Sequence, residues 1–391
     1  MATLLLIVIY ITFIGLGLPD SLLGAAWPVM HQALSVPLDM AGFASVVTTG
    51  GTVISSLVSE RLIRRFGTAR ITAASVAMTA AALVCVSVSG RFHALLLCCV
   101  PLGLGAGTVD AALNNFVALH YKSTHMNWLH CFWGVGATAG PLIMSFYLAR
   151  GAWRVAYRTV SPTLAGIALL LVVSLPLWRR FGGAAGDGAA AAPTKKRALL
   201  RLPGAVSACL AFVAYCGMEY AAGLWASTYF VQVRGLGADV AASWASAYFL
   251  GITGGRLAAG FLAMKLSDRT LVRLGLGLAA LGLCVLLLPL PGAFPLAGLL
   301  LLGLGSAPVF PCLLDQTPAL FGAGYSQGMM GLQMAGAYIG GSLMGPLFGW
   351  LSPAIGVGAW PCYLLALLCV LAAATEYTQR AARRSGGPSG K

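Results

Sequence analysis

The chain has 391 residues, of which 59% are hydrophobic and only 9% are charged. A soluble domain normally carries about 25% charged residues, so this composition excludes a water-soluble globular protein and suits a surface that faces lipid. The formal net charge of +14 would fit a nucleic-acid-binding protein if the basic residues formed one patch. They are instead distributed over turns along the whole chain, which excludes nucleic acid as a partner.

Apolar runs of about 20 residues, the length that crosses a bilayer, recur from one end of the chain to the other. They predict an all-α polytopic membrane protein with twelve transmembrane helices, at 3–33, 40–59, 70–90, 93–119, 127–149, 159–178, 203–232, 238–264, 270–290, 293–320, 326–351 and 358–377. The first run has no basic segment before it and no obvious cleavage site, so we expect a span rather than a signal peptide.

Basic residues gather in alternate turns. Most of the 24 Lys and Arg lie in the turn 60–70, the linker 179–202, the turn 265–269 and the tail 380–391. By the positive-inside rule, both termini face the cytoplasm, and we expect a bacterial inner-membrane protein. The turn 149–158 goes against this trend. It is either a feature of the outer rim or a sign that the predicted end of the fifth span is misplaced.

The segment "RRFGGAAGDGAAAAPTKKR" divides the chain into two sets of six spans. We predict an N-terminal half at 1–178, a cytoplasmic linker at 179–202, a C-terminal half at 203–379 and a basic tail at 380–391. The halves also repeat: "LGLGAGTV" (102–109) matches "LGLGSAPV" (302–309), "GG" (50–51) matches "GG" (254–255), and "GVGATAGP" (134–141) loosely matches "GAYIGGSL" (336–343). Parallel repeats of this kind indicate an alternating-access transporter with its binding site near the midplane.

The twelve spans, the central linker and the basic turn "SERLIRRFGTAR" resemble the major facilitator superfamily, whose fold has two pseudo-symmetric six-helix halves. More narrowly, "GLPDSLLGAAWP", "ALNNFVA" and "FPCLLDQTPALFG" are similar to the fucose–galactose–glucose:proton symporter group. The resemblance implies a conformational gate at Glu60, Arg61, Arg65 and Gly67. It also implies a proton-coupling acid in the fourth span and a sugar-binding acid in the first, the positions of Asp110 and Asp20.

Four acidic residues lie inside predicted spans: Asp20, Asp110, Glu219 and Asp315, in spans one, four, seven and ten. The superfamily fold, if the resemblance holds, places those spans around a central cavity. An intramembrane carboxyl group is a functional candidate by default, and a low-dielectric pocket disfavours its charged form, which allows proton loading near ambient pH. We predict Asp110, Asp20 and Glu219 as proton-coupling residues. Asp315 ranks last because it lies further toward the cytoplasmic end.

A carboxylate near an aromatic ring suits a polyhydroxylated ligand, as with Glu219 and Trp225, although Trp225 could equally be an interfacial anchor. No Lys or Arg lies in the central part of a predicted span, since Arg256, which is inside a span, is near its cytoplasmic end. A carrier for organic anions would be expected to offer such a base, so its absence favours a neutral or cationic substrate. The predicted substrate-binding residues are Asp20, Asn114, Asn115, Asn127, His130, Glu219, Trp225, Asp315, Gln316 and Gln333.

The leading hypothesis is proton-coupled uptake of a sugar or similar neutral polar solute by a monomer. The rival is an efflux antiporter for amphipathic or cationic compounds, because "GATAGP" (136–141) partly resembles the antiporter signature of the superfamily. Sodium is the alternative coupling ion. A non-transporting sensor or assembly factor would leave the interior acids without a purpose. No nucleophile–base or metal motif is present, so we expect no enzymatic activity, no cofactor and no bound metal.

Overall fold

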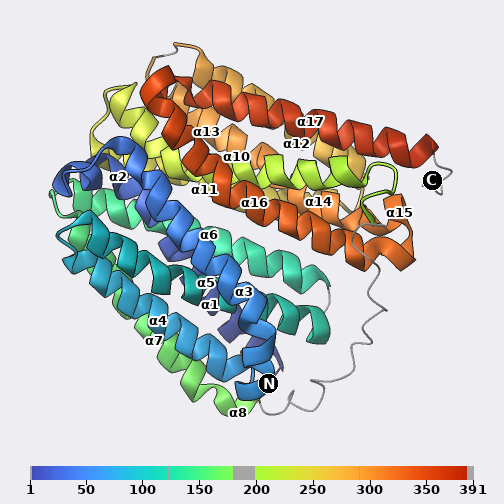
Figure 1. Ribbon diagram of the computed structural model, residues 1–391, viewed down its shortest axis with the longest axis horizontal. Coiled ribbons are helices and arrows are strands. Elements are labelled where there is room, and N and C mark those ends of the chain that lie inside the picture. Colours follow the sequence, from blue (N-terminus) through green and yellow to red (C-terminus); the bar gives the residue numbers. More distant parts are fainter. Residues whose placement is uncertain (1, 122, 179–198, 290, 385–391) are drawn as a thin grey trace.

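The computed structural model describes residues 2–121, 123–178, 199–289 and 291–384, and every regular element in these ranges is a helix (Figure 1). The N-half helices are α1 (Ala2–Asp20), α2 (Leu22–Ala33), η1 (Leu38–Met40), α3 (Ala41–Phe66), α4 (Thr68–Val88), α5 (Phe92–His120), α6 (Ser123–Leu148), α7 (Trp153–Val173) and α8 (Leu175–Trp178).

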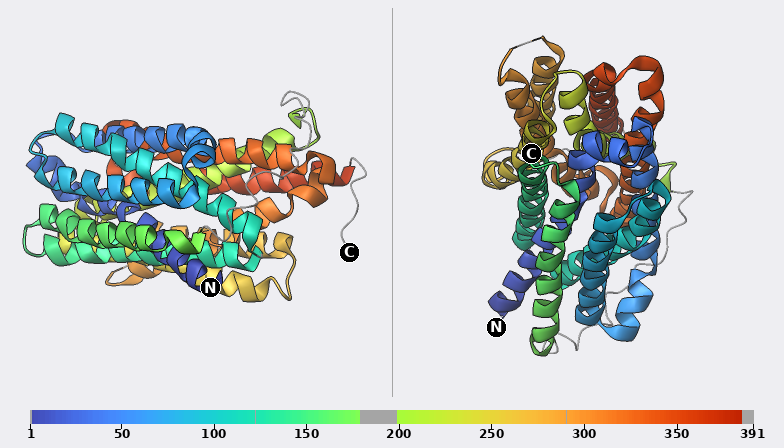
Figure 2. Two further views of the ribbon diagram at one scale, coloured as in Figure 1. Left: turned by 90° about the horizontal axis from the view of Figure 1, so that it is seen from below. Right: turned by 90° about the vertical axis from the view of Figure 1, so that its left-hand side faces the viewer.

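The C-half helices are α10 (Ala205–Gln232), α11 (Ala238–Leu262), α12 (Asp268–Leu287), α13 (Phe294–Ser306), α14 (Val309–Asp315), α15 (Thr317–Phe321), α16 (Ala323–Ile355), η3 (Val357–Ala359) and α17 (Trp360–Arg384). The two sets run side by side along the long axis (Figure 2). The division at 179–202 stays a prediction, because 179–198 and 385–391 lie outside the described residues.

In the described part of the chain, nine helical segments are long and apolar enough to span a bilayer. The three other predicted spans form long helices, α3, α11 and α16, whose composition is less apolar. All three pack across the two halves, α3 against α16 and α11 against α6. A helix that faces another helix rather than lipid is free to carry Gly, Ser and Thr. The prediction of an all-helical, multi-span membrane protein is confirmed.

Two of the predicted spans are broken inside the bundle. The first span divides at Ser21 into α1 and α2, directly after Pro19 and Asp20. The tenth divides at Pro308 into α13 and α14. Proline cannot donate a backbone hydrogen bond and so weakens helical continuity at these positions. The first break places the carboxyl group of Asp20 at the end of a helix inside the molecule.

The basic turn at 149–158 is shorter than predicted. Helix α6 ends at Leu148, as the fifth predicted span does to within one residue, but α7 begins at Trp153 rather than at 159. Arg154 and Arg158 therefore lie in the first turns of α7, where they donate hydrogen bonds to the Ser89 carbonyl and the Ser87 hydroxyl, both at 3.2 Å. The predicted end of the fifth span is therefore correct to within one residue, whereas the predicted start of the sixth span is wrong, because the helix begins among charged residues.

The internal repeat is visible in how glycines pack the helices. A Cβ atom on Gly103 would collide with the carbonyl oxygen of Thr48, and one on Gly303 would collide with that of Tyr248. The contact of α5 with α3 in the N-half is thus repeated by the contact of α13 with α11 in the C-half, with both partners shifted by the same number of residues. In this register Gly51, which packs on α5, corresponds to Gly251, which packs on α13. The predicted match of 50–51 with 254–255 is therefore wrong by about one helical turn.

The two halves meet at one end of the molecule, which we call the sealed end. There α2 packs on α10, with Gly24 against Gly223, and the Ser227 hydroxyl donates to the carbonyl oxygen of Ala25 at 3.3 Å. Phe43 and Trp350 lie with ring centroids 6.1 Å apart between α3 and α16. Toward the other end, which we call the open end, the two sets of helices diverge (Figure 1).

Gly103→Ala should destabilise the fold, because the added methyl group forces α5 away from α3. Overpacking of this kind costs about 1–3 kcal/mol. The expected result is a lower melting temperature of the purified protein in detergent. Gly50→Ala is the matched control, since a Cβ atom there meets no neighbouring atom within 4 Å. Equal melting temperatures for the two variants would contradict the tight α3–α5 contact.

Candidate functional site

Asp20 lies at the break between α1 and α2 and is exposed, although Pro19 and Ser21 beside it are buried. Its carboxylate accepts a hydrogen bond from the indole nitrogen of Trp133 at 2.9 Å. Close packing of α1 on α6 brings the two together, because a Cβ atom on Gly17 would collide with the backbone oxygen of Trp133. The indole is a neutral donor, so Asp20 is hydrogen-bonded there without a counter-ion.

Trp133 also contacts a base. The guanidinium carbon of Arg256 lies 5.4 Å from the centroid of a Trp133 ring, within the range of a cation–π interaction. Arg256 lies 3.6 Å from a carboxylate oxygen of Glu219 and donates to the carbonyl oxygen of His130 at 3.4 Å. A continuous polar chain therefore runs from Glu219 through Arg256 and Trp133 to Asp20, and it crosses from the C-half to the N-half.

The position of Arg256 corrects the argument from charge. Its backbone lies in the last two turns of α11, as the sequence indicated, but its long side chain reaches Glu219 in the middle of α10. Both side chains are largely buried, with 13% and 12% exposed. The interior thus contains a base, and its supposed absence no longer favours a neutral or cationic substrate.

Asp110 lies in α5, and the amide of Asn114 one turn later donates to its carboxylate at 2.8 Å. Asp20 and Asp110 are near enough for their charges to interact. Tyr220, whose side chain is 51% exposed, lies within electrostatic range of Asp20, Asp110 and Glu219. The structure therefore brings three of the four predicted interior acids, which lie on three different helices, to one region.

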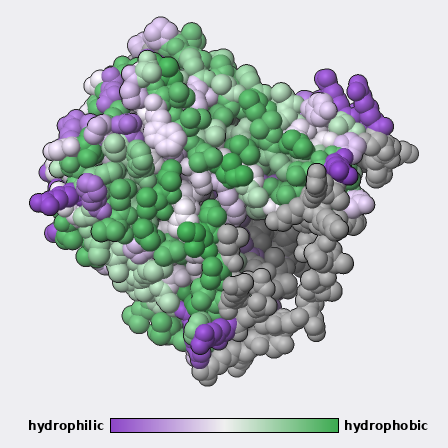
Figure 3. All heavy atoms as spheres, in the orientation of Figure 1, coloured by the Kyte–Doolittle hydropathy of each residue, from purple (hydrophilic) through white to green (hydrophobic). Residues whose placement is uncertain are grey.

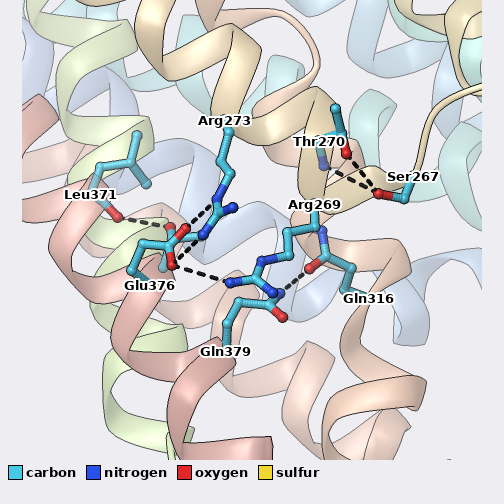
Figure 4. A network of polar contacts seen from close by, with 9 residues as sticks. Ser267, Arg269, Thr270, Arg273, Gln316, Leu371, Glu376 and Gln379 are labelled. Carbon is cyan, nitrogen blue, oxygen red and sulfur yellow. Dashed lines mark hydrogen bonds and ion pairs between the residues drawn. The ribbon is translucent and has the colours of Figure 1, made fainter. Parts of the chain in front are cut away.

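The fourth acid lies elsewhere. Asp315 is exposed at the end of α14, beside Asp268. The amide side chain of its neighbour Gln316 bonds that of Gln379 on α17, next to the network in which Glu376 pairs with Arg269 and Arg273 (Figure 4). Asp315 and Gln316 are therefore separated from the region of Asp20.

Two other predicted ligand-binding residues serve packing. Trp225 is fully buried, and its indole nitrogen donates to the carbonyl oxygen of Gly345 at 2.9 Å, which ties α10 to α16. Gln333 is 2% exposed and accepts a hydrogen bond from the hydroxyl of Thr317 at 2.9 Å. The indole nitrogen of Trp225 and the amide oxygen of Gln333 are therefore hydrogen-bonded within the protein.

Several predicted residues have side chains outside the described part of the structure. These are Asn115, Asn127, Glu60 and Arg61. Of the predicted gate, Arg65 is exposed and packs over the ring of Phe66, while Gly67 joins α3 to α4 with a φ of 84°. That backbone conformation favours glycine. The gate itself stays a prediction, as do the substrate-binding roles of the two asparagines.

Asp20 and Tyr220 both have solvent-exposed side chains. Figure 3 shows the surface hollowed between the two sets of helices, on the side where they diverge. At the sealed end, the contacts between Gly24 and Gly223 and between Ser227 and Ala25 close the same interface. Among the described residues the two halves thus meet at one end and diverge at the other, which is the arrangement of an alternating-access transporter in one of its two states.

The sequence analysis missed three residues of this region: Trp133, Arg256 and Tyr220. Arg256 carried a usable signal, because a charged residue in an apolar span is itself a functional candidate. Trp133 lies three residues before "GATAGP" and Tyr220 directly follows Glu219, but aromatic residues are common in membrane helices. Their proximity to the acids depends on helix packing and carries no local sequence pattern.

Comparisons with known proteins bear on the family and the fold, not on these side chains. A family profile described as Major Facilitator Superfamily matches residues 9–326. The chain is 24% identical over 282 residues to Bypass of stop codon protein 6 of Saccharomyces cerevisiae, covering 65% of this chain and 56% of that protein. It is 25% identical over 164 residues to Membrane protein MosC of Rhizobium meliloti, covering 42% and 40%. The chain thus spans about half the length of these relatives or less.

Two solved transporters have a similar fold. One is a bacterial homolog of the human lysosomal transporter Spinster in an inward-facing, occupied conformation, with a TM-score of 0.72, 12% identity, and coverage of 98% of this chain and 97% of that chain. The other is a peptide transporter, POT, in complex with sulfate, with a TM-score of 0.75, 14% identity, and coverage of 97% and 95%. At these identities the likeness concerns the fold alone.

Gly24→Leu should open the sealed end, because the larger side chain cannot fit against the backbone of Gly223. Spin labels on exposed Gln32 and Val233, near the ends of α2 and α10, report the separation. The expected result is a longer and broader distance distribution than in the otherwise unsubstituted protein. Gly90→Leu is the control, because a Cβ atom there has no neighbour within 4 Å. An unchanged distribution in Gly24→Leu would show that this contact does not close the interface.

Proposed function

The chain belongs to the major facilitator superfamily, and we propose that it is a proton-coupled secondary transporter that takes up a sugar or a similar small polar solute. The observation that carries this proposal is the carboxylate of Asp20 at a helix break, exposed between buried neighbours and held by Trp133. Discontinuous helices line the substrate sites of many transporters. An indole beside a carboxylate offers a sugar both an apolar surface and a hydrogen-bond acceptor.

Proton coupling is supported by the partners of the two N-half acids. Asp20 accepts a hydrogen bond from an indole and Asp110 accepts one from an amide, and both donors are neutral. A carboxyl group with a cationic partner is held in its charged form, whereas one with neutral partners in a low-dielectric interior gains a proton more easily. Protonation of either group breaks no ion pair that the structure describes. Both are therefore suited to load and release a proton.

The distribution of basic residues supports an assignment of the open end to one side of the membrane. The basic residues of the turn 60–70 and of the end of α17 lie on the side of the open end. The positive-inside rule supports a cytoplasmic position for that side, and we therefore propose that this conformation is an inward-open state with both termini in the cytoplasm. In a bacterial inner membrane, inward-directed proton flow would then drive uptake. The turn containing Arg65 and Gly67 is our proposed gate at this mouth.

The similarity of "GLPDSLLGAAWP" to the fucose–galactose–glucose:proton symporter group supports the sugar class. The printed names of the two curated relatives identify no substrate. One observation favours the rival function of efflux: exposed Asp20 lies near Asp110, and two adjacent carboxyl groups would attract a cationic compound. The two functions differ in whether lipophilic cations or sugars exchange across the membrane.

Asp110→Asn should uncouple transport, because an amide keeps the shape and the hydrogen bond to Asn114 but cannot carry a proton. In proteoliposomes, counterflow of a panel of monosaccharides should persist in the variant. Accumulation driven by an inward proton gradient should fall to the equilibration level, while the unsubstituted protein accumulates the sugar.

Asp315→Asn is the matched control, since this acid lies apart from Asp20 and should leave accumulation intact. Accumulation retained in Asp110→Asn would exclude this residue as the coupling acid. Exchange of lipophilic cations without exchange of any sugar would favour the efflux antiporter. Accumulation that follows a sodium gradient at constant pH would identify sodium as the coupling ion.

A further inference from the structure

The ion pair between Arg256 and Glu219 is incomplete. Within the described part of the chain, the Arg256–Glu219 contact of 3.6 Å is longer than a hydrogen bond, and the guanidinium group donates at 3.4 Å to the carbonyl oxygen of His130 and lies close to the hydroxyl of Tyr215. A buried ion pair repays the cost of desolvation only when its geometry is good and the remaining donors and acceptors are satisfied. A pair this loose, in a largely buried position, leaves donor capacity on Arg256 unused.

The same chain shows what a complete pair looks like. At the cytoplasmic end of α17, Glu376 accepts two hydrogen bonds from Arg273, at 2.6 and 2.8 Å, and a third from Arg269 at 3.4 Å (Figure 4). This fork is the usual way in which arginine holds a carboxylate. The contrast indicates that the Arg256 pair is open to exchange, whereas the Glu376 network is a structural link between α12 and α17.

Two further donors lie beside the pair. The hydroxyl groups of Tyr215 and Tyr248 are buried, and neither makes a hydrogen bond of good geometry with a described residue, although Tyr215 lies close to Glu219 and Arg256, and Tyr248 lies close to Ser306. Both tyrosines are at most 1% exposed, and both lie within electrostatic range of Glu219 and Arg256. Burial of a hydroxyl group without a good hydrogen bond is destabilising. One anion bound at Arg256 could accept hydrogen bonds from the guanidinium group and from these hydroxyls.

We propose that Arg256, together with the hydroxyl groups of Tyr215 and Tyr248, binds a carboxylate group of the transported solute. This inference rests on the proposed transport function and specifies its substrate class as a hydroxylated carboxylic acid. Trp133 and Asp20, which adjoin Arg256, bind the hydroxylated part. The solute carboxylate takes the place of Glu219 on Arg256.

Displacement of Glu219 couples binding to a proton. Once Arg256 binds the solute, the carboxylate of Glu219 is left buried without a counter-ion, and such a group takes up a proton rather than stay charged. One proton enters with one carboxylate, so the net charge of the site does not change. Glu219 is the carboxyl group in contact with Arg256, which makes it the acceptor of that proton.

The titratable groups that face this pair come from every side. They are Tyr215, Cys216 and Tyr220 on α10, Tyr248 on α11, His130 and Cys131 on α6, with Asp20 of α1 and Asp110 of α5 reached through Tyr220, and Tyr338 of α16 reached through Cys216. The tyrosines and cysteines remain neutral in the range between pH 5 and 8 when buried. Glu219 is therefore separated from the other two carboxyl groups by neutral side chains.

The test measures acetate binding to the purified protein, from the increase in melting temperature in sodium acetate relative to sodium chloride at equal ionic strength. In the unsubstituted protein, affinity should rise as the pH falls, by up to tenfold per pH unit, the limit for one proton taken up per anion bound. In Glu219→Gln the site is already vacated, so acetate should bind more tightly and its affinity should not depend on pH. In Arg256→Gln the acetate response should disappear.

Arg273→Gln is the matched control, since it removes the same type of side chain from the Glu376 network and should leave the acetate response intact. If Arg256→Gln does not fold, Arg256→Lys keeps the charge but loses the fork, and a weakened response is expected. Absence of an acetate effect in Glu219→Gln, or an undiminished effect in the Arg256 variants, would overturn the inference. Failure of the proposed function is seen separately, as counterflow that moves no solute at all.

Discussion

A charge inside a helical bundle must be neutralised by a partner or reached by water, because the surrounding protein and lipid solvate it poorly. This constraint accounts for the position of each interior acid. Asp20 is exposed, and Asp110 is half-buried and accepts a hydrogen bond from the amide of Asn114. Glu219 is largely buried and lies beside Arg256. The cavity, the helix break after Pro19 and the cross-half position of Arg256 are three ways of meeting the same requirement.

The two halves repeat in packing but differ in chemistry. Gly103 on Thr48 and Gly303 on Tyr248 are equivalent contacts, which give the same close approach of two helices in each half. The polar groups do not follow this symmetry: the N-half acids have neutral partners, whereas the C-half acid faces a base. Trp133 joins the two kinds of site, since one indole binds Asp20 through its N–H and Arg256 through its ring. A rocking motion of the halves must change that contact.

The sequence was sufficient for the spans, because about 20 apolar residues in a row have few other uses. It also singled out Asp20, Asp110 and Glu219, which the structure places near one another, while their proposed roles stay a prediction. It was not sufficient to predict which way a side chain points from its helix, or how far a long side chain extends. Trp225 faces α16 rather than the cavity, and an apolar helix carries no hydrophobic face from which that rotation could be read. Arg256 was judged by the depth of its backbone, but its side chain extends to Glu219.

The pairing of the acids suggests a division of roles. A proton on Asp20 or Asp110 changes the charge of the site without breaking an ion pair, so these groups can respond to pH whether or not a solute is bound. Glu219 can accept a proton at low cost only when something else takes its place on Arg256. Under the proposed mechanism its protonation is tied to occupancy, which is what a proton symporter requires to avoid a proton leak. Because Arg256 touches both halves, the same exchange also alters the contact that has to break when the cavity changes sides.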